Sequence, residues 1–280
     1  MNLTPNILLS YPKSGSTLIR YCLEFLTQKP TSGWDTVLIP VRRHGGTEEA
    51  ILLRPHEVSF GYDRSHNLAV LLRNPLELVL RPWDNPTAAL NLLLARPYGE
   101  GARLVPPNPK HGGKHTAFEN CRILGEEARE EVKDLIIELQ KTPFSQQPTA
   151  LKNKVIRYFA TFLCREYNSF LSLYESHTGP KTIIYYEDLL ESFLPVKKLV
   201  TEVYEVKLAN NLEEFLAAES HHRARCLQLT SGTNLAKSDS KSPIFYQKNS
   251  HPDLLHDLNQ IIREELEELS PYVGRYLPNK

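Results

Sequence analysis

The sequence has few cysteines, and those it has are far apart. Its 280 residues include four cysteines, with no Cys-x-x-Cys pair and no paired His and Cys spacing. A disulfide framework or a zinc site would need such pairs, so this distribution argues against both. We expect reduced, mostly buried thiols at Cys22, Cys121, Cys164 and Cys226.

An excess of one charge and a long apolar run are also missing. Lys plus Arg and Asp plus Glu both total 33, which argues against a general nucleic-acid-binding protein and requires any anion site to be local. No uninterrupted apolar stretch reaches the length of about 18 residues that indicates a membrane span, and no basic and apolar leader follows Met1. We therefore expect a soluble, cytoplasmic protein that binds neither nucleic acid nor a membrane.

At 41% hydrophobic residues the chain can bury a full core, and we expect a single domain over residues 1–280. Short apolar runs end in polar turns that open helical patterns, which predicts an α/β fold with a central, mostly parallel sheet flanked by helices. Strands are expected at residues 7–10, 50–53, 68–72 and 182–186. Further helices are expected at residues 126–141, 151–176, 196–206, 211–218 and 254–269. We also expect a lid or insertion at about 82–125 and a polar loop at 231–250.

The most informative segment is Tyr-Pro-Lys-Ser-Gly-Ser-Thr at residues 11–17. An apolar strand precedes it and a helical pattern follows it, so the turn opens onto a helix N-terminus. Backbone N–H groups and the helix dipole favour an anion there, and Lys13 adds a mobile positive charge. The lysine precedes the lone glycine, so the spacing is not that of a Walker A loop. The turn predicts a site for a phosphate or sulfate group.

This turn resembles the cofactor loop of sulfotransferases that use 3′-phosphoadenosine 5′-phosphosulfate (PAPS), in which Tyr-Pro-Lys-Ser-Gly-Thr-Thr cradles the 5′-phosphosulfate. Six of the seven residues are the same, and Ser16 keeps the hydroxyl of the threonine it replaces. The resemblance implies a three-layer sandwich of the P-loop NTPase-like type. It also implies that PAPS is bound by Lys13, Ser14, Gly15, Ser16 and Thr17.

A second segment, Arg54-Pro55-His56, resembles the end of the family's strand that carries Lys-Thr-His. It implies that His56 is the catalytic base and that Arg54 and Lys13 stand beside the transferring sulfonate. Histidine suits a base because its ordinary pKa of about 6.5 lets it accept a proton at neutral pH. His66 is the reserve candidate for this role.

Two more segments extend the resemblance. Arg73-Asn74-Pro75 resembles the family's Arg-Asn-Pro-Lys-Asp-Val motif, which implies that Arg73 holds the 3′-phosphate of PAPS with its bidentate guanidinium. Arg81 occupies the place of a serine that contacts the same phosphate in the family. Tyr-Glu-Asp at residues 186–188 implies that Tyr186 lies beside the adenine. Leu18 stands where cytosolic members have an adenine-stacking tryptophan, and their C-terminal Arg-Lys-Gly-x-x-Gly loop is not recognisable.

The resemblance implies in-line transfer of the sulfonate from PAPS to a hydroxyl or amine of a small-molecule acceptor, without a metal. A sugar, an alkaloid or another secondary metabolite would fit, as in small bacterial or natural-product tailoring sulfotransferases, and the oligomeric state stays open. Two alternatives remain. A P-loop nucleotide or small-molecule kinase needs a Gly-Lys-Ser/Thr ending, and a catalytically inactive nucleotide-binding module would be expected to have lost Lys13 or His56.

Overall fold

A computed structural model gives the arrangement of the chain. It describes residues 6–11, 13–32, 37–39, 50–53, 66–80, 134–135, 137–138, 146, 148–230, 250–266, 268 and 270–277. The chain forms two compact units, the first of residues 1–74 and 169–243 and the second of residues 75–168 and 244–280. The sheet and the basic turn both belong to the first unit.

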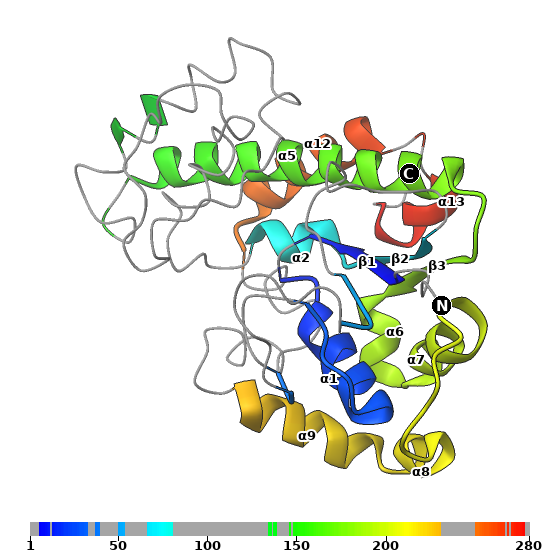
Figure 1. Ribbon diagram of the computed structural model, residues 1–280. Coiled ribbons are helices and arrows are strands. Elements are labelled where there is room, and N and C mark those ends of the chain that lie inside the picture. Colours follow the sequence, from blue (N-terminus) through cyan, green and yellow to red (C-terminus); the bar gives the residue numbers. More distant parts are fainter. Residues whose placement is uncertain are drawn as a thin grey trace. The chain divides into compact units, whose positions relative to one another are not determined.

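The strands β1 (Asn6–Ser10), β2 (Asn67–Leu72) and β3 (Lys181–Tyr185) form a sheet in that order, and each pair of neighbours is parallel (Figure 1). β1 is buried throughout, and β2 is buried along nearly its whole length. Continuous apolar runs of this kind are typical of strands inside a parallel sheet. The α/β class and the parallel strands predicted from the sequence are therefore confirmed.

The strand predicted at residues 50–53 is shorter than expected. Leu53 forms an isolated parallel bridge with Ile7. The Leu8 amide donates to the carbonyl of Leu53 at 2.9 Å, and the Leu53 amide donates to the carbonyl of Asn6 at 2.8 Å. Because the other edge of β1 pairs with β2, this segment lies along the free edge of β1 as a bridge and not as a regular strand.

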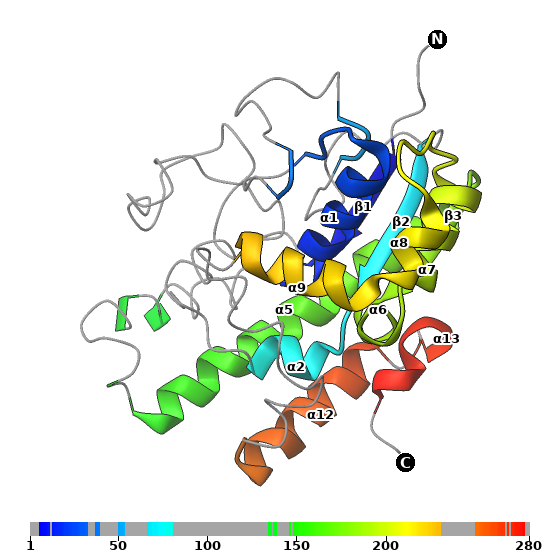
Figure 2. The same ribbon diagram turned by 90° about the horizontal axis from the view of Figure 1, so that it is seen from below.

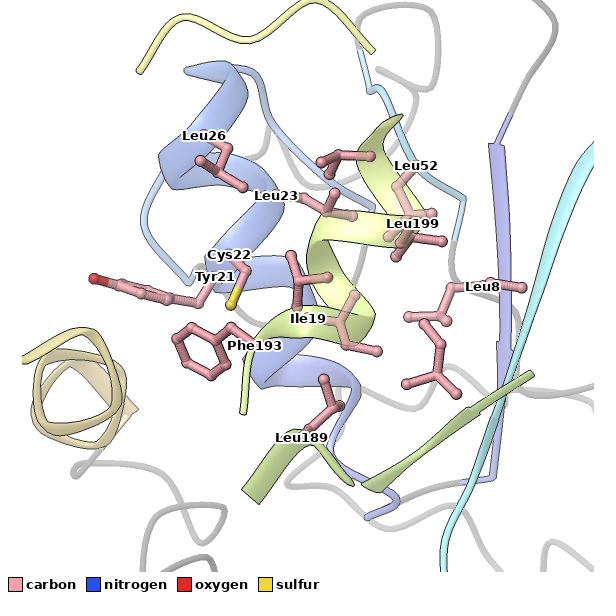
Figure 3. Packing of buried hydrophobic residues seen from close by; sticks show 14 of the residues in the cluster. Leu8, Ile19, Tyr21, Cys22, Leu23, Leu26, Leu52, Leu189, Phe193 and Leu199 are labelled. Carbon is pink, nitrogen blue, oxygen red and sulfur yellow. The ribbon is translucent and has the colours of Figure 1, made fainter. Parts of the chain in front are cut away.

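Helix α1 (Ser16–Thr27) follows the basic turn and carries much of the core of the first unit. Figure 3 shows Ile19 and Leu23 on the side of α1 that faces Leu8 of β1, and all three are fully buried. This burial holds the first turn of α1 at the end of β1. Among the described residues, the unit also contains α6 (Tyr186–Glu191), α7 (Leu194–Lys198), α8 (Leu212–Ala217) and α9 (Glu219–Thr230) (Figure 2). The π-helical turn η4 (Leu199–Val203) follows α7.

Two sequence predictions for this unit need correction, and one helix was missed. The helix expected at residues 196–206 is divided between α7 and η4, and the Tyr204 hydroxyl that follows donates to the carbonyl of Ile7 at 2.7 Å. The last predicted strand ends at Tyr185, so Tyr186 opens a helix. Helix α9 was not expected, because its sequence is polar and has no continuous apolar stripe.

A buried carboxylate ties the segment after α1 back to the helix. Glu24 is fully buried, and its Oε1 accepts hydrogen bonds from the hydroxyl of Thr31 at 2.5 Å and from its amide at 3.3 Å. Its Oε2 accepts from the amides of Leu38 and Ile39, each at 2.8 Å. Arg20 completes the cluster with a 2.8 Å hydrogen bond from Nε to the Thr31 hydroxyl. Leu38 and Ile39, which lie 14 and 15 positions after Glu24 in the sequence, are therefore fixed to its side chain.

The part of α5 (Thr149–Ser176) up to residue 168 belongs to the second unit, where it pairs with α12 (Pro252–Leu266). Arg157 forms an ion pair with Asp257, and Arg165 approaches Glu265 at 3.2 Å. These helices confirm the predictions at residues 151–176 and 254–269 within a few residues. This unit also contains α2 (Pro75–Leu80), the short α13 (Ser270–Val273) and the 3₁₀ turn η6 (Gly274–Tyr276).

Three of the four cysteines lie within the described residues. Cys22, Cys164 and Cys226 are buried and form no disulfide with a described residue, and burial raises the pKa of the Cys22 and Cys164 thiols, whereas Cys121 lies outside the described residues. Among the helices that the structure describes, none combines the length and the apolar character that a membrane span requires.

A buried histidine joins α1 to α9. The Nδ1 atom of His222 lies 3.0 Å from the hydroxyl of Tyr21, and the imidazole packs 4.4 Å from the ring of Phe25 and 4.5 Å from that of Phe215. Burial lowers the pKa of His222 below its ordinary value of 6.5, and His221 and Arg225 lower it further. Burial also raises the pKa of Tyr21 to about 12. Both groups are therefore neutral near pH 7.

The lowered pKa of His222 predicts that the first unit loses stability in mild acid. Below pH of about 6.5 the unfolded chain binds a proton at this position that the folded chain does not, so the free energy of unfolding falls until the pH reaches the folded pKa. His177 has a lowered pKa as well and contributes in the same direction. In His222→Gln we expect the free energy of unfolding, measured by urea titration, to fall less steeply between pH 7 and pH 5. The exposed His251→Gln control should keep the steeper dependence, and an unchanged slope in His222→Gln would contradict the account.

Candidate functional site

The basic turn joins the end of β1 to the start of α1. The amide of Ser14 donates to the carbonyl of Tyr11 at 3.1 Å, which closes the turn. Lys13 has φ 71° and Gly15, the N-cap of α1, has φ 99°, so both lie in the left-handed region. That region is uncommon for a residue with a side chain, so the surrounding structure has to hold Lys13 there.

The turn presents hydrogen-bond donors at a helix N-terminus. Gly15 provides no side chain to cap α1, and the amides of Gly15 and Thr17 donate no hydrogen bond to any residue that the structure describes. Ser14 is fully buried, and within the described chain its hydroxyl has no hydrogen-bond partner. Such donors, together with the positive end of the helix dipole, favour an anion. The prediction of a strand, a basic turn and a helix N-terminus is confirmed.

Residues that follow β2 and β3 lie against this turn. Because the strands are parallel, their carboxyl ends meet at one edge of the sheet, with Ser10 beside Leu71 and Leu72 beside Tyr185. The next residue after β2 is Arg73, and its Nη1 donates to the carbonyl of Lys13 at 3.1 Å. Ligands of open α/β sheets bind at such an edge. Three segments that are far apart in the sequence therefore converge at one place.

Tyr186 closes the turn from the side of β3. Its ring lies 4.0 Å below the guanidinium carbon of Arg73, and both side chains are only 2% exposed. The ring also contacts Gly15 so closely that a Cβ atom there would lie 2.2 Å from Cδ2 of Tyr186. Only glycine fits this position, because of both its backbone angle and the missing side chain.

A further contact at this edge was not predicted. The amide of Asn74 donates to Oε1 of Glu187 at 2.9 Å, which ties the turn after β2 to the first turn of α6. The sequence signal was present, since Glu187 and Asp188 form an acidic pair at a helix start, but it indicates only a favourable interaction with the helix dipole. The structure adds a second connection between the segments that carry Arg73 and Tyr186.

The predicted site residues divide into two groups. At the carboxyl edge the structure brings together Lys13, Ser14, Gly15, Ser16, Thr17, Arg73 and Tyr186. The predicted catalytic residues Arg54 and His56, the predicted phosphate ligand Arg81 and the expected lid at about 82–125 all lie outside the described residues.

His66, the reserve candidate for the catalytic base, does not lie at this edge. It immediately precedes β2, whose first residue pairs with Asn6 at the start of β1. The backbone there bonds to the segment before β3, with the Leu68 amide donating to the carbonyl of Pro180 at 2.9 Å. His66 is therefore at the amino edge of the sheet, opposite the turn. It does not meet the turn that it would have to serve.

Two other features bear on the chemistry of the site. Arg223 of α9 stacks 4.2 Å from the ring of Phe193 and approaches Glu219 at 3.5 Å, so this arginine is engaged in the packing of α9. No group of three or more His, Cys, Asp or Glu side chains suited to a metal ion is found in the described portion of the chain. Comparisons with known protein families, curated proteins and solved structures gave no match to this chain. Its function therefore has to be argued from the turn and the residues packed around it.

Proposed function

We propose that this protein is a PAPS-dependent sulfotransferase that transfers the sulfonate to a hydroxyl or amine of a small-molecule acceptor. The observation that carries the proposal is the convergence of three separate segments at one sheet edge. The turn at residues 11–17, Arg73 after β2 and Tyr186 after β3 each resemble a part of the nucleotide site of that family, and they are in mutual contact. A chance resemblance in each segment would not require such contacts.

The donors at the turn fit the sulfated end of PAPS. Its 5′-phosphosulfate would be held by the amides of residues 15–17, the ammonium of Lys13 and the buried hydroxyl of Ser14, which lacks a partner within the described chain. Bound PAPS supplies an activated sulfonate whose leaving group is a phosphate. The proposed overall fold is the three-layer, P-loop NTPase-like sandwich of these enzymes, built on the parallel sheet described above.

The proposed chemistry depends on position and charge. Lys13 and the turn amides stabilise the negative charge that develops on the bridging oxygen, and donors fixed in advance do so without reorganising. Arg54 is proposed to neutralise the sulfonate oxygens, and Nε2 or Nδ1 of His56 to accept the proton of the acceptor hydroxyl or amine. No covalent bond to the protein is needed in this scheme.

Replacing Lys13 with methionine is expected to lower turnover by roughly 10²–10³-fold, because one preorganised donor to a developing charge typically has that effect. Nucleotide affinity should fall much less, since the amides remain. The measurement is mass-spectrometric detection of sulfonated products from PAPS with a panel of hydroxyl and amine acceptors. The matched control is Lys29→Met, because Lys29 is exposed and follows the end of α1. Equal turnover of Lys13→Met and the unsubstituted protein would contradict the proposal.

A further inference from the structure

The guanidinium of Arg73 is directed at the protein backbone. Its Nη1 donates to the carbonyl of Lys13 at 3.1 Å, across 60 positions of sequence, and the side chain is only 2% exposed. A hydrogen bond from a charged donor is stronger than one between neutral groups. The residue that receives it is the one whose backbone lies in the uncommon left-handed region, with φ 71°. Arg73 therefore contacts the turn where the turn most needs support.

Tyr186 supports the same turn at its other left-handed residue. One ring both stacks 4.0 Å from the Arg73 guanidinium and fills the space beside Gly15 that a side chain would occupy. The planar guanidinium of Arg73 is suited to stacking on the flat ring of Tyr186, and the compact ammonium group of a lysine would not reproduce this contact. Lys13 and Gly15 are thus held by two side chains that also hold each other.

We propose that Arg73 is a positioning residue of the turn. By holding the carbonyl of Lys13, with Tyr186 fixing its orientation, it sets the direction of the turn amides toward the anion. This role differs from the one implied by the resemblance, in which the same arginine holds the 3′-phosphate directly. The inference rests on the proposed function for the identity of the nucleotide, but not for the presence of the clamp formed by Arg73 and Tyr186.

Two nucleotides separate the two roles. The affinities of 3′-phosphoadenosine 5′-phosphate and of adenosine 5′-phosphate are measured by calorimetry for the unsubstituted protein, Arg73→Lys and Tyr186→Leu. A positioning role predicts that in Arg73→Lys the affinity for both nucleotides falls by the same factor, roughly 10- to 100-fold. Tyr186→Leu should lower both affinities in the same way, although neither substitution removes a charge. Tyr186→Phe, which keeps the ring, should retain most of the affinity. Selective weakening of the 3′-phosphorylated nucleotide in Arg73→Lys would overturn the inference.

A second measurement needs no nucleotide. The amides of Ser14 and Leu18 donate to the carbonyls of Tyr11 and Gly15, and their hydrogen exchange should become faster in Arg73→Lys and Tyr186→Leu. The amides of residues 19–27 in α1 should keep their protection. Arg275→Lys is the matched control, since this exposed arginine also lies over a tyrosine ring, that of Tyr276 at 5.8 Å. If neither nucleotide binds the unsubstituted protein, the proposed function fails while the exchange result still decides the clamp. Unchanged exchange of the Ser14 and Leu18 amides would overturn the clamp.

Discussion

Gly15→Ala is expected to abolish nucleotide binding at the turn and to lower the free energy of unfolding by about 2–5 kcal/mol. Two independent costs add up. The backbone angle of φ 99° is strained for any residue with a side chain, and the new methyl group would lie 2.2 Å and 2.5 Å from two ring carbons of Tyr186. Neither atom has room to yield, because that ring is itself buried against Arg73. The turn would have to open, and its amides would lose their direction.

Urea denaturation and calorimetry with 3′-phosphoadenosine 5′-phosphate measure the two effects. Gly274→Ala is the matched control, since a Cβ at Gly274 meets nothing within 4 Å, and it should change stability by less than about 0.5 kcal/mol. In a Tyr186→Leu background the steric part of the cost should shrink while the backbone part remains. Normal stability and affinity in Gly15→Ala would mean that the turn is not as described.

Glu24→Ala is expected to destabilise the first unit by about 3–5 kcal/mol, the usual cost of removing one partner of a buried charged pair. The carboxylate is fully buried and accepts from Thr31, Leu38 and Ile39. Its loss would remove the acceptor of three amides and of the Thr31 hydroxyl, and would leave the charge of Arg20, which is 1% exposed, without a carboxylate at this place. An unsatisfied buried donor costs far more than a hydrogen bond contributes on average.

The control for Glu24→Ala is another glutamate whose ion pair is exposed. Glu213 pairs with Lys197 at 2.8 Å, but these side chains are 72% and 42% exposed, so Glu213→Ala should cost no more than about 1 kcal/mol. Both variants are compared by urea denaturation at neutral pH. Similar free energies of unfolding for the two variants would show that Glu24 does not anchor Thr31, Leu38 and Ile39.

The parts of the fold that the sequence predicted well depend on local patterns. The apolar run of β1, the polar turn and the apolar face of α1 are contiguous, so β1 was expected at nearly its observed bounds and the turn was expected to open onto a helix, which is α1. Contacts between distant segments were not predictable in the same way. Nothing in the sequence around Arg73 indicates that its Nη1 reaches the carbonyl of Lys13, although the same sequence placed both residues at the site.

The Glu24 cluster and α9 illustrate two further limits. Arg20 and Glu24 are four positions apart on a helix, a spacing that usually indicates an exposed ion pair, yet both are buried, and Glu24 accepts from Thr31, Leu38 and Ile39. The sequence of helix α9 is mostly polar and has no continuous apolar stripe, so its periodicity gave no signal. Its burial depends on a few side chains, including His222 and Cys226, that meet α1 and α8. Tertiary packing overrode the local pattern in both cases.

Calorimetric titration of the purified protein with 3′-phosphoadenosine 5′-phosphate, with ATP and Mg²⁺ as the competing ligand, tests the central claim most directly. The sulfotransferase account predicts binding of the bisphosphate, loss of that binding in Gly15→Ala, and no comparable affinity for ATP. The desulfated nucleotide is the product of the proposed reaction, so no acceptor has to be known. Failure of the bisphosphate to bind, or a preference for ATP with Mg²⁺, would contradict the account and favour a P-loop kinase.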